Sequence, residues 1–437
     1  MSAEQQHAAA ATRRRFKKYV NNLASALGHA DRVAPFCSYT TGLMLPGDRK
    51  SVEPMAARIA PDHVRATHQS MHHFVAQAEW SDRAIMSKVY EVVLPAIQRH
   101  GPIRTWIVDD TGIPKKGSQS VGVAHQYCGQ LGKQANCQVA VTLSIANDFA
   151  SLPVAHRLYL TEDWIKDKER RTKTGVPNKI RFATKPQIAL EQIRAAHAAG
   201  IAPGVIVADA AYGNTTIFRD EIAAMGLPYI LSVQSNTTVW GPGEAPLPPL
   251  KGKKRLGRPR TAMRRTARHA PIALAELAAA TPPQAFRTIT WREGTNTSLE
   301  SRFAAVRVRP AHRDTLRSTA RDEEWLLIEW PKGEAAPRKY WLSNLPASTT
   351  REELVEFAQS RWRIERDYQE LKDELGLGHY EGRSWRGFHH HATLCIAAYG
   401  FLIAERGLFS PGGTLRAALR QSPVPADFRP RGSSGAR

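Results

Sequence analysis

The stretch Thr105-Trp106-Ile107-Val108-Asp109-Asp110 joins four residues typical of a buried strand to two adjacent acids. The apolar run is short and stops abruptly, which predicts a strand with acidic side chains at its carboxyl end. A second run, Val205-Ile206-Val207-Ala208, has the same character and is followed by Asp209. Because ligands and catalytic groups commonly lie at the carboxyl ends of strands in open α/β sheets, the two segments predict an α/β fold with functional acids there.

The segments that follow the first strand predict further strands and helices. Residues 139–146 and 152–160 have strand character on either side of a turn, and residues 183–199 have a helical pattern. A helix over about 215–225 and a strand over 229–231 come after the second acidic strand. Three strands followed by alternating helix and strand resemble the element order of an RNase H-like sheet with mixed strand directions.

The composition favours a globular, basic protein. The chain has 437 residues, enough for two or three domains, and 42% of them are hydrophobic, which argues against wholesale disorder. Lys and Arg number 61 against 40 Asp and Glu, so the formal net charge is +21. This excess indicates a polyanionic partner, most commonly nucleic acid. The alternative is a basic protein from a genome whose codon bias favours arginine.

The cysteines and the hydropathy pattern bear on the cellular compartment. Cys37, Cys128, Cys137 and Cys395 form no CxxC pair and no zinc-like spacing, as is typical of thiols in a reducing compartment. No apolar stretch reaches the roughly 18 residues of a membrane span. The amino terminus is polar and shows no signal peptide. We therefore expect a cytoplasmic protein without a membrane partner.

The texture of the sequence changes on both sides of the predicted sheet. Residues 1–95 show helical periodicity, with Ser81-Asp82 as the N-cap of one helix. The segment from about 235 to 345 begins Pro- and Gly-rich and basic, then becomes strand-like, which predicts a β-rich insertion. The expected strands of this insertion are 286–291, 303–308, 325–330 and 339–342, and the helices after it are about 350–375 and 392–403.

Three acids are candidate metal ligands: Asp110, Asp209 and Glu365. Hard divalent cations such as Mg²⁺ take oxygen ligands, usually a few carboxylates together with substrate phosphate. Two such ions about 3.5–4 Å apart activate an attacking oxygen and stabilise the leaving one. A carboxylate cluster in a basic protein therefore suits phosphodiester cleavage. The alternative is that acids at strand ends are helix caps or solvated turn residues.

The predicted helix around Glu365 favours the functional interpretation. Arg361, Glu365 and Lys372 lie four and seven residues apart and therefore share a narrow stripe, next to an apolar stripe that includes Ile364 and Tyr368. The charged stripe then lies at the rim of a cleft, where cations hold phosphates and the acid holds metal. The alternative is an ordinary surface helix with i, i+4 ion pairs.

Three ordered segments carry a family resemblance. Residues 108–117 read Val-Asp-Asp-Thr-Gly-Ile-Pro-Lys-Lys-Gly, residues 207–213 read Val-Ala-Asp-Ala-Ala-Tyr-Gly, and residues 362–365 read Trp-Arg-Ile-Glu, continued by 370–372 and 381–387. They resemble, in this order, the motifs of bacterial insertion-sequence transposases with an Asp-Asp-Glu (DDE) triad. The resemblance covers roughly residues 15–405. It points to the cut-and-paste branch, which has an RNase H-like core and a β-rich insertion before the Glu.

The resemblance implies roles for particular acids. Asp110, Asp209 and Glu365 correspond to the catalytic metal ligands, which hold two Mg²⁺ ions, with Mn²⁺ as a substitute. Asp110 is preferred because the acid of the family directly precedes the Thr, and Asp109 is the alternative. The partners implied are double-stranded DNA, as terminal inverted repeats and as target, and a second copy of the chain on paired ends. The implied location is the bacterial cytoplasm, at the nucleoid.

The Glu helix departs from the family at one position. The related pattern is Tyr, two residues, Arg, three residues, Glu, six residues, Lys. Arg361, Glu365 and Lys372 fit it and are expected to contact DNA, but Ala358 stands where the Tyr belongs. The phosphate contact of that Tyr is therefore not assigned to this chain.

Further DNA contacts are expected outside the triad. Trp341 lies near the position at which relatives that form DNA hairpins stack a flipped base on a Trp. A Trp in a strand is, however, more often part of the core. Arg258 and Arg260 belong to a basic run that resembles an AT-hook, or else form a solvated loop that touches phosphates. Lys115 and Lys116 follow the first motif and are expected to line the cleft, although most lysines are solvated.

The sequence thus predicts a transposase that cuts and joins DNA. An inactive DNA-binding remnant of a transposase and a general nuclease of the same fold are the alternatives. The predicted parts are a helical region that binds DNA ends (1–95), the first part of the RNase H-like core (96–234), a basic and β-rich insertion (235–345), the second part of the core (346–405) and a disordered tail (406–437).

Overall fold

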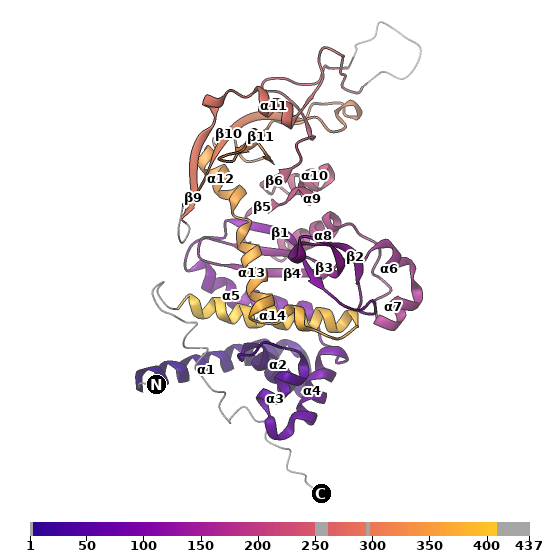
Figure 1. Ribbon diagram of the computed structural model, residues 1–437, viewed down its shortest axis with the longest axis vertical. Coiled ribbons are helices and arrows are strands. Elements are labelled where there is room, and N and C mark those ends of the chain that lie inside the picture. The colour runs from indigo at the N-terminus through magenta and orange to yellow at the C-terminus, as the bar shows by residue number, and fades with distance from the viewer. Residues whose placement is uncertain (1–2, 250–260, 294–297, 409–437) are drawn as a thin grey trace. The chain divides into compact units, whose positions relative to one another are not determined.

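The computed structural model describes residues 3–249, 261–293 and 298–408 (Figure 1). Arg258 and Arg260 of the basic run, and the tail from residue 409, lie outside the described residues. The chain forms two compact units. Within the described residues, unit 1 consists of 3–104, 109–201 and 363–408, and unit 2 consists of 105–108, 202–249, 261–293 and 298–362.

Unit 1 begins with helices, as the periodicity of residues 1–95 predicts. Ser81 caps the fifth helix, because its hydroxyl accepts a hydrogen bond from the backbone N–H of Ala84 at 3.1 Å. Ile85, Val89 and Val93 form the buried stripe of that helix. The predicted helical amino-terminal region is therefore confirmed. Its helices are α1 (Ala3–Ala24), α2 (Val33–Met44), α3 (Val52–Ile59), α4 (Val64–Ala76) and α5 (Asp82–Gln98).

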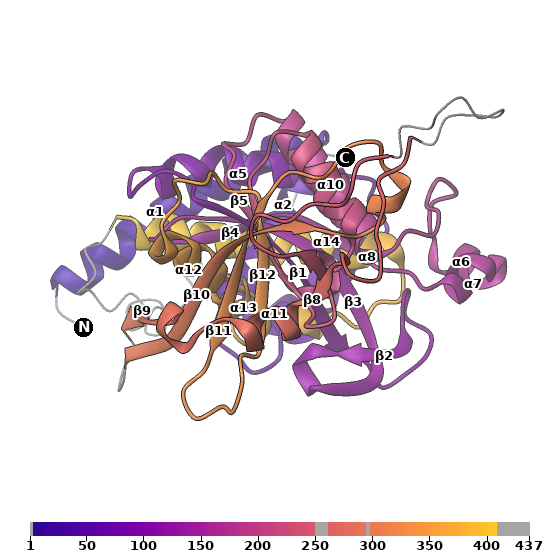
Figure 2. The same cartoon turned by 90° about the horizontal axis from the view of Figure 1, so that it is seen from above.

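The sheet of unit 1 is built around β3 (Lys133–Ala146). This strand pairs antiparallel with β2 (Ala124–Cys128) and β4 (Ser151–Leu158), and β1 (Thr105–Pro114) is the next strand in the order. A helix, α8 (Lys185–Ala198), covers one face of β3, where Gln192 donates to the carbonyl of Val141 at 2.9 Å (Figure 2). Two short helices precede it, α6 (Glu162–Lys166) and α7 (Lys168–Thr174).

The strand β1 is longer than the apolar run alone predicts. The acids were expected at its carboxyl end, but Asp109 and Asp110 lie in its middle and the strand continues to Pro114. Thr111, Gly112 and Ile113 are buried, and the N–H of Lys115 donates to the carbonyl of Asn136 beside it at 2.9 Å. The expected end of the strand was wrong because backbone hydrogen bonds to the neighbouring strand, rather than apolar side chains, keep β1 extended beyond Asp110.

Unit 1 closes with α13 (Trp362–Asp373), which belongs to it from Arg363, and α14 (Trp385–Arg406). The yellow helix α14 is buried along most of its length and packs on α5 and β4 (Figure 1). All three residues of the run His389-His390-His391 are buried. This environment explains why α14 is apolar on all sides rather than amphipathic.

Unit 2 contains a mixed sheet in the order β1-β5-β6-β12-β11-β10-β7-β8, with β9 beside β10. The pairs β1–β5 and β5–β6 are parallel, and the other pairs are antiparallel. The β-rich segment therefore extends the sheet of β5 and β6, and β10, β11 and β12 run side by side (Figure 2). Its strands are β5 (Val205–Ala208), β6 (Tyr229–Val233), β7 (Thr238–Trp240), β8 (Ile272–Ala273), β9 (Arg287–Glu293), β10 (Ser298–Pro310), β11 (Glu324–Trp330) and β12 (Lys339–Ser343).

Apolar clusters bury both faces of this sheet. One contains Val205, Val207 and Trp341 together with Leu354 and Val355 of α12 (Arg351–Gln359). The other lies under α11 (Leu274–Ala280). Two further helices, α9 (Ala210–Gly213) and α10 (Thr216–Ala224), follow β5. The predicted α/β class with a mixed sheet is confirmed.

The helix expected over 350–375 is divided in two. Thr350 and Glu353 form a capping box at the start of α12, which ends at Gln359, and α13 begins at Trp362. Arg361 lies in the turn between them, so it is not on the same helix as Glu365. The expectation of one helix was wrong because α12 packs in the core of unit 2, whereas α13 packs in unit 1.

Candidate active site

The adjacent acids of β1 have different surroundings. The carboxylate of Asp109 accepts a hydrogen bond from the backbone N–H of Asp110 at 2.8 Å. The hydroxyl of Thr142 donates to the carbonyl of Asp109 at 3.0 Å. The carboxylate of Asp110 forms an ion pair with Lys185, the first residue of α8. Asp110 is therefore engaged by the helix that covers one face of the sheet.

Asp109 lies near α13, the helix that carries Glu365. Burial lowers the pKa of the Lys372 ammonium, and the negative charge of Asp109 is among the charges that oppose this effect. Burial also raises the pKa of the Tyr368 hydroxyl, and the charges of Asp367 and Asp109 add to the rise. The charge of Asp109 thus affects the pKa values of two residues of α13, Tyr368 and Lys372. Asp110 acts instead on Cys137, whose pKa burial raises to about 11.

A buried carboxylate, Asp367, attaches α13 to β4 and α14. Asp367 accepts hydrogen bonds from the hydroxyl of Ser151 at 2.6 Å and from that of Tyr399 at 2.8 Å. Burial raises the pKa of Asp367 to about 7. The ion pair of Glu370 with Arg406, at 2.7 Å, adds a second attachment to α14. Glu365 lies in the first turn of the helix and is exposed.

Asp209 follows β5 directly and caps α9. Its carboxylate accepts a hydrogen bond from the N–H of Ala211 at 2.9 Å. The short helix lies tight against β6, because a Cβ at Gly213 would be 2.0 Å from the carbonyl oxygen of Ser232. Only glycine permits this approach, so the backbone after Asp209 is closely held. The sequence correctly predicts the place of Asp209 at a strand end.

The other predicted DNA contacts have varied surroundings. The ammonium of Lys115 donates to the carbonyl of Tyr380 at 2.7 Å, and burial lowers its pKa. Lys116 is exposed. Trp341 has 6% of its surface exposed within the apolar cluster beside α12, and Ala358 belongs to the same cluster. Most of the Trp341 ring is therefore packed in the core of unit 2.

The structure divides the predicted triad between the two units. Asp109, Asp110, Glu365 and Lys372 belong to unit 1, whereas Asp209 belongs to unit 2. Within the described residues, no group of three or more His, Cys, Asp or Glu is placed to hold a metal ion. The donor set nevertheless suits Mg²⁺, since it consists of carboxylate oxygens, and Asp109 and Asp209 are only partly buried.

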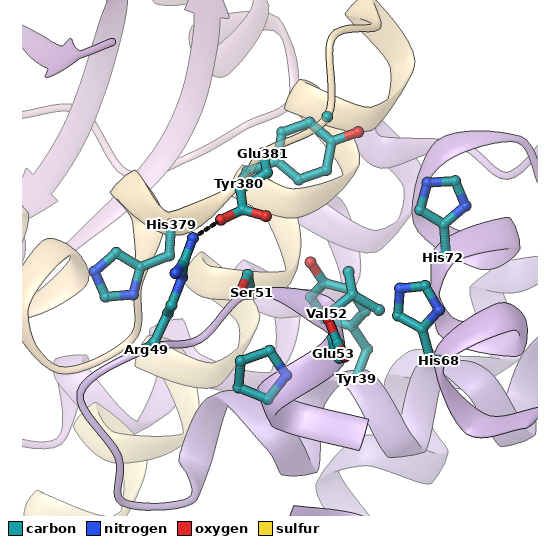
Figure 3. Close-up of a pocket in the computed structure, with 12 residues that line it drawn as sticks. Tyr39, Arg49, Ser51, Val52, Glu53, His68, His72, His379, Tyr380 and Glu381 are labelled. Atoms are coloured by element: carbon teal, nitrogen blue, oxygen red, sulfur yellow. Dashed lines mark hydrogen bonds and ion pairs between the residues drawn. The ribbon is translucent and has the colours of Figure 1, made fainter. Parts of the chain in front are cut away.

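A pocket of about 320 Å³ lies in unit 1, between the helical region and the segment that follows α13 (Figure 3). Arg49 reaches across its rim to form an ion pair with Glu381. The rings of His68 and His72 stack on the other side, with centroids 6.0 Å apart. The run of three histidines does not contribute to it, because each of those rings is hydrogen-bonded inside the protein.

Several site residues have little or no signal in the sequence. Lys185 follows a helix N-cap, and only the fold reveals that it reaches Asp110. Ser151 and Tyr399 are 216 and 32 residues from Asp367, so no local pattern links them. The sequence offers one hint for Lys185. It begins α8, the helix before the parallel strand β5, and such a helix begins at the edge of the sheet where the strand ends.

Comparison with known proteins identifies the family. The family model of DDE superfamily endonucleases matches residues 22–298, which include Asp109, Asp110 and Asp209 but not α13. A probable transposase for insertion sequence element IS701 from Microchaete diplosiphon is 29% identical over 189 residues. That match covers 43% of this chain and 45% of the relative, so the chain spans less than half of the length of the relative. No described helix has the length and apolarity needed to cross a membrane. With the family model covering more than half of its length, the chain belongs to the DDE endonuclease superfamily.

Proposed function

We propose that the protein is a transposase that cuts DNA at the ends of an insertion sequence and joins them to target DNA. Membership of the DDE endonuclease family and the similarity to a probable insertion-sequence transposase support this proposal. The formal charge of +21 suits a DNA partner. The catalytic acids that we propose are Asp109, Asp209 and Glu365, which would hold two Mg²⁺ ions, or Mn²⁺ in their place.

The observation that carries the choice of acids is the register of two parallel strands. Inside unit 2, Ile107 of β1 lies opposite Val207 of β5. Partners in a parallel pair point to the same face, and side chains alternate between faces along each strand. Asp109 lies two residues after Ile107, and Asp209 lies two residues after Val207. The two acids are therefore expected on the same face of the sheet as Ile107 and Val207. Val207 contacts the cluster of α12, the helix that leads into α13.

The side chain of Asp110 is expected on the opposite face of the sheet, and its ion pair with Lys185 supports this assignment. The charge of Asp109 acts on Tyr368 and Lys372 of α13, whereas that of Asp110 acts on Cys137 and its carboxylate pairs with Lys185 of α8. We therefore propose Asp109 as the metal ligand, in place of the Asp110 that the family resemblance implies. Asp110 then holds the start of α8.

The chemistry follows from the proposed residues. The bound cations would activate a water, and later a freed 3′-hydroxyl, and would stabilise the leaving oxygen. Glu365, being exposed in the first turn of α13, is accessible to DNA. Lys372 is half-buried near Asp109 and would hold a phosphate beside the acids, and Arg361 would hold another. We propose that two copies act on paired ends and that the helical region contacts the terminal repeats.

The experiment supplies the protein with Mg²⁺, a donor duplex that carries the repeats flanking its coding region, and a target plasmid. The proposal predicts cleavage at the element boundary and a product in which the ends are joined to the plasmid. Cleavage that ignores the terminal repeats would replace the proposal with a general nuclease. Tight binding to the repeats without cleavage would replace it with an inactive DNA-binding remnant. A scrambled-end duplex is the control.

A further inference from the structure

A groove opens in unit 2 at the residue that follows Asp209. Its volume is about 560 Å³, and Ala210 forms one side of it. Val233 and several polar or basic residues form the rest, and among the described residues that line it none is acidic. The polar and basic residues are Ser232, Gln234, Ser235, Asn236, Arg338 and Lys339.

The strand order explains why these residues meet beside Asp209. Because β5 and β6 are parallel, their carboxyl ends lie at the same edge of the sheet. Asp209 follows one strand at this edge, and Gln234 follows the other. The neighbouring strand β12 is antiparallel, with Tyr340 opposite Val233, so its amino end reaches the same edge. Lys339 begins β12, and the fold thereby delivers two cations to the end of the sheet where Asp209 lies.

The two cations are available to an external anion. The side chains of Arg338 and Lys339 are 66% and 57% exposed. Arg338 pairs with Glu334 at 3.0 Å, and Lys339 pairs with Glu329 at 3.3 Å. The Arg338–Glu334 pair is solvent-accessible on both sides and contributes only about 0–1 kcal/mol, so a phosphate competes with it at little cost. The side chain of Glu329 is only 4% exposed, so Lys339 keeps this partner and offers the other N–H groups of its ammonium to a phosphate. Arg338 can therefore exchange Glu334 for a bound phosphate, whereas Lys339 can bind a phosphate in addition to Glu329.

The remaining side chains suit a phosphodiester backbone. Hydroxyls of Ser232 and Ser235 and amides of Gln234 and Asn236 donate hydrogen bonds readily to phosphate oxygens. Exposed cations along an open groove fit a polyanion that contacts several of these side chains at once. None of the described residues that line the groove is aromatic, so they offer no surface on which a base could stack.

We propose that this groove holds the phosphodiester backbone of the DNA strand next to the phosphate cut at Asp209. This inference rests on the proposed function, because it takes DNA as the substrate. Arg338 and Lys339 each neutralise one phosphate, and the hydroxyl and amide groups fix the path of the strand without reading its sequence. The groove thereby keeps the strand in register with the acid that follows β5.

The test measures how DNA binding depends on salt. The protein carries Glu365→Gln and is kept in EDTA, so a labelled duplex of mixed sequence stays intact. We compare it with the same protein carrying Arg338→Gln and Lys339→Gln. Each lost phosphate contact lowers the slope of log K against log salt by about 0.9, so the double variant is expected to lose about 1.8. Its affinity is expected to fall roughly ten- to a hundredfold at about 0.1 M salt.

The matched control removes two exposed arginines of unit 2 that do not line the groove, Arg287→Gln and Arg317→Gln. Unchanged thermal unfolding verifies that both double variants are folded. An unaltered slope in the groove variant, or an equal loss in the control, overturns the inference. If the wild type cuts element ends while the groove variant keeps its slope, the inference fails and the proposed function stands. A chain that binds no DNA overturns both.

Discussion

The buried ring of His391 on α14 allows a direct test of the interior of unit 1, because its burial predicts how stability changes with pH. The residue has 2% of its surface exposed, its Nδ1 lies 2.9 Å from the hydroxyl of Tyr39, and its Nε2 lies 3.0 Å from the carbonyl of Gly376. A neutral ring satisfies both contacts, since Nε2–H donates to the carbonyl and Nδ1 accepts from the hydroxyl. Burial lowers the pKa of His391 from 6.5 to about 4.

The pKa difference sets both the sign and the size of the effect. Above pH 6.5 the ring is neutral in both the folded and the unfolded chain, so its contribution to stability is fully present. As the pH falls from 6.5 to about 4, the unfolded chain takes up a proton that the folded chain refuses, and stability is lost. At 1.36 kcal/mol for each pKa unit, the loss approaches about 3 kcal/mol.

The assay is urea unfolding of the wild type and of His391→Gln at several pH values between neutral and about 4. Glutamine keeps one donor and one acceptor but does not titrate. The wild type is expected to lose up to about 3 kcal/mol more than the variant on acidification. His156 and His390 are also buried with lowered pKa values, but they affect both proteins alike. Parallel losses in the two proteins would refute the reasoning.

Two further predictions concern the acids of β1 and the turn after β5. Asp109→Asn is expected to reduce Mg²⁺-dependent cleavage by about a hundredfold or more, whereas Asp110→Asn retains most of it; the reverse ranking in a cleavage assay would restore Asp110 as the ligand. Gly213→Ala is expected to destabilise unit 2 by roughly 1–3 kcal/mol in urea unfolding, because the new methyl group would meet the carbonyl of Ser232. Gly129→Ala, whose Cβ would meet nothing within 4 Å, is its control, and an equal effect in both would contradict the packing.

The sequence predicts β5 with its bounds because Val205–Ala208 is a continuous apolar run buried in a parallel sheet. It also predicts β9, β10, β11 and β12 of the β-rich segment from their strand-like runs, but not the short strands β7 and β8. It does not predict that β12 pairs with β6, since this pairing joins residues about a hundred positions apart. The β-rich segment therefore looks like a separate insertion in the sequence, although its strands extend the sheet.

The division between α12 and α13 has no local signal. No proline or glycine lies near Ser360, and the apolar stripe passes through it without a change of phase. The helix breaks because its two halves pack in different cores. The acids of β1 show a similar limit. Two adjacent aspartates in a motif do not reveal which of them lies on which face of the sheet. Only the register of β1 with β5 distinguishes the two.

We propose that Asp109 of β1, Asp209 after β5 and Glu365 of α13 support metal-dependent cleavage of DNA. The most direct test compares the wild type with Glu365→Gln on a duplex that carries the ends of the element, in Mg²⁺, with binding measured in parallel. The substitution removes the charge but keeps the size of the side chain. Nicking at the element boundary by the wild type, lost by about a hundredfold or more in the variant with binding retained, is the expected result. Equal cleavage by the two proteins would contradict the claim, because Glu365 would then hold no catalytic metal.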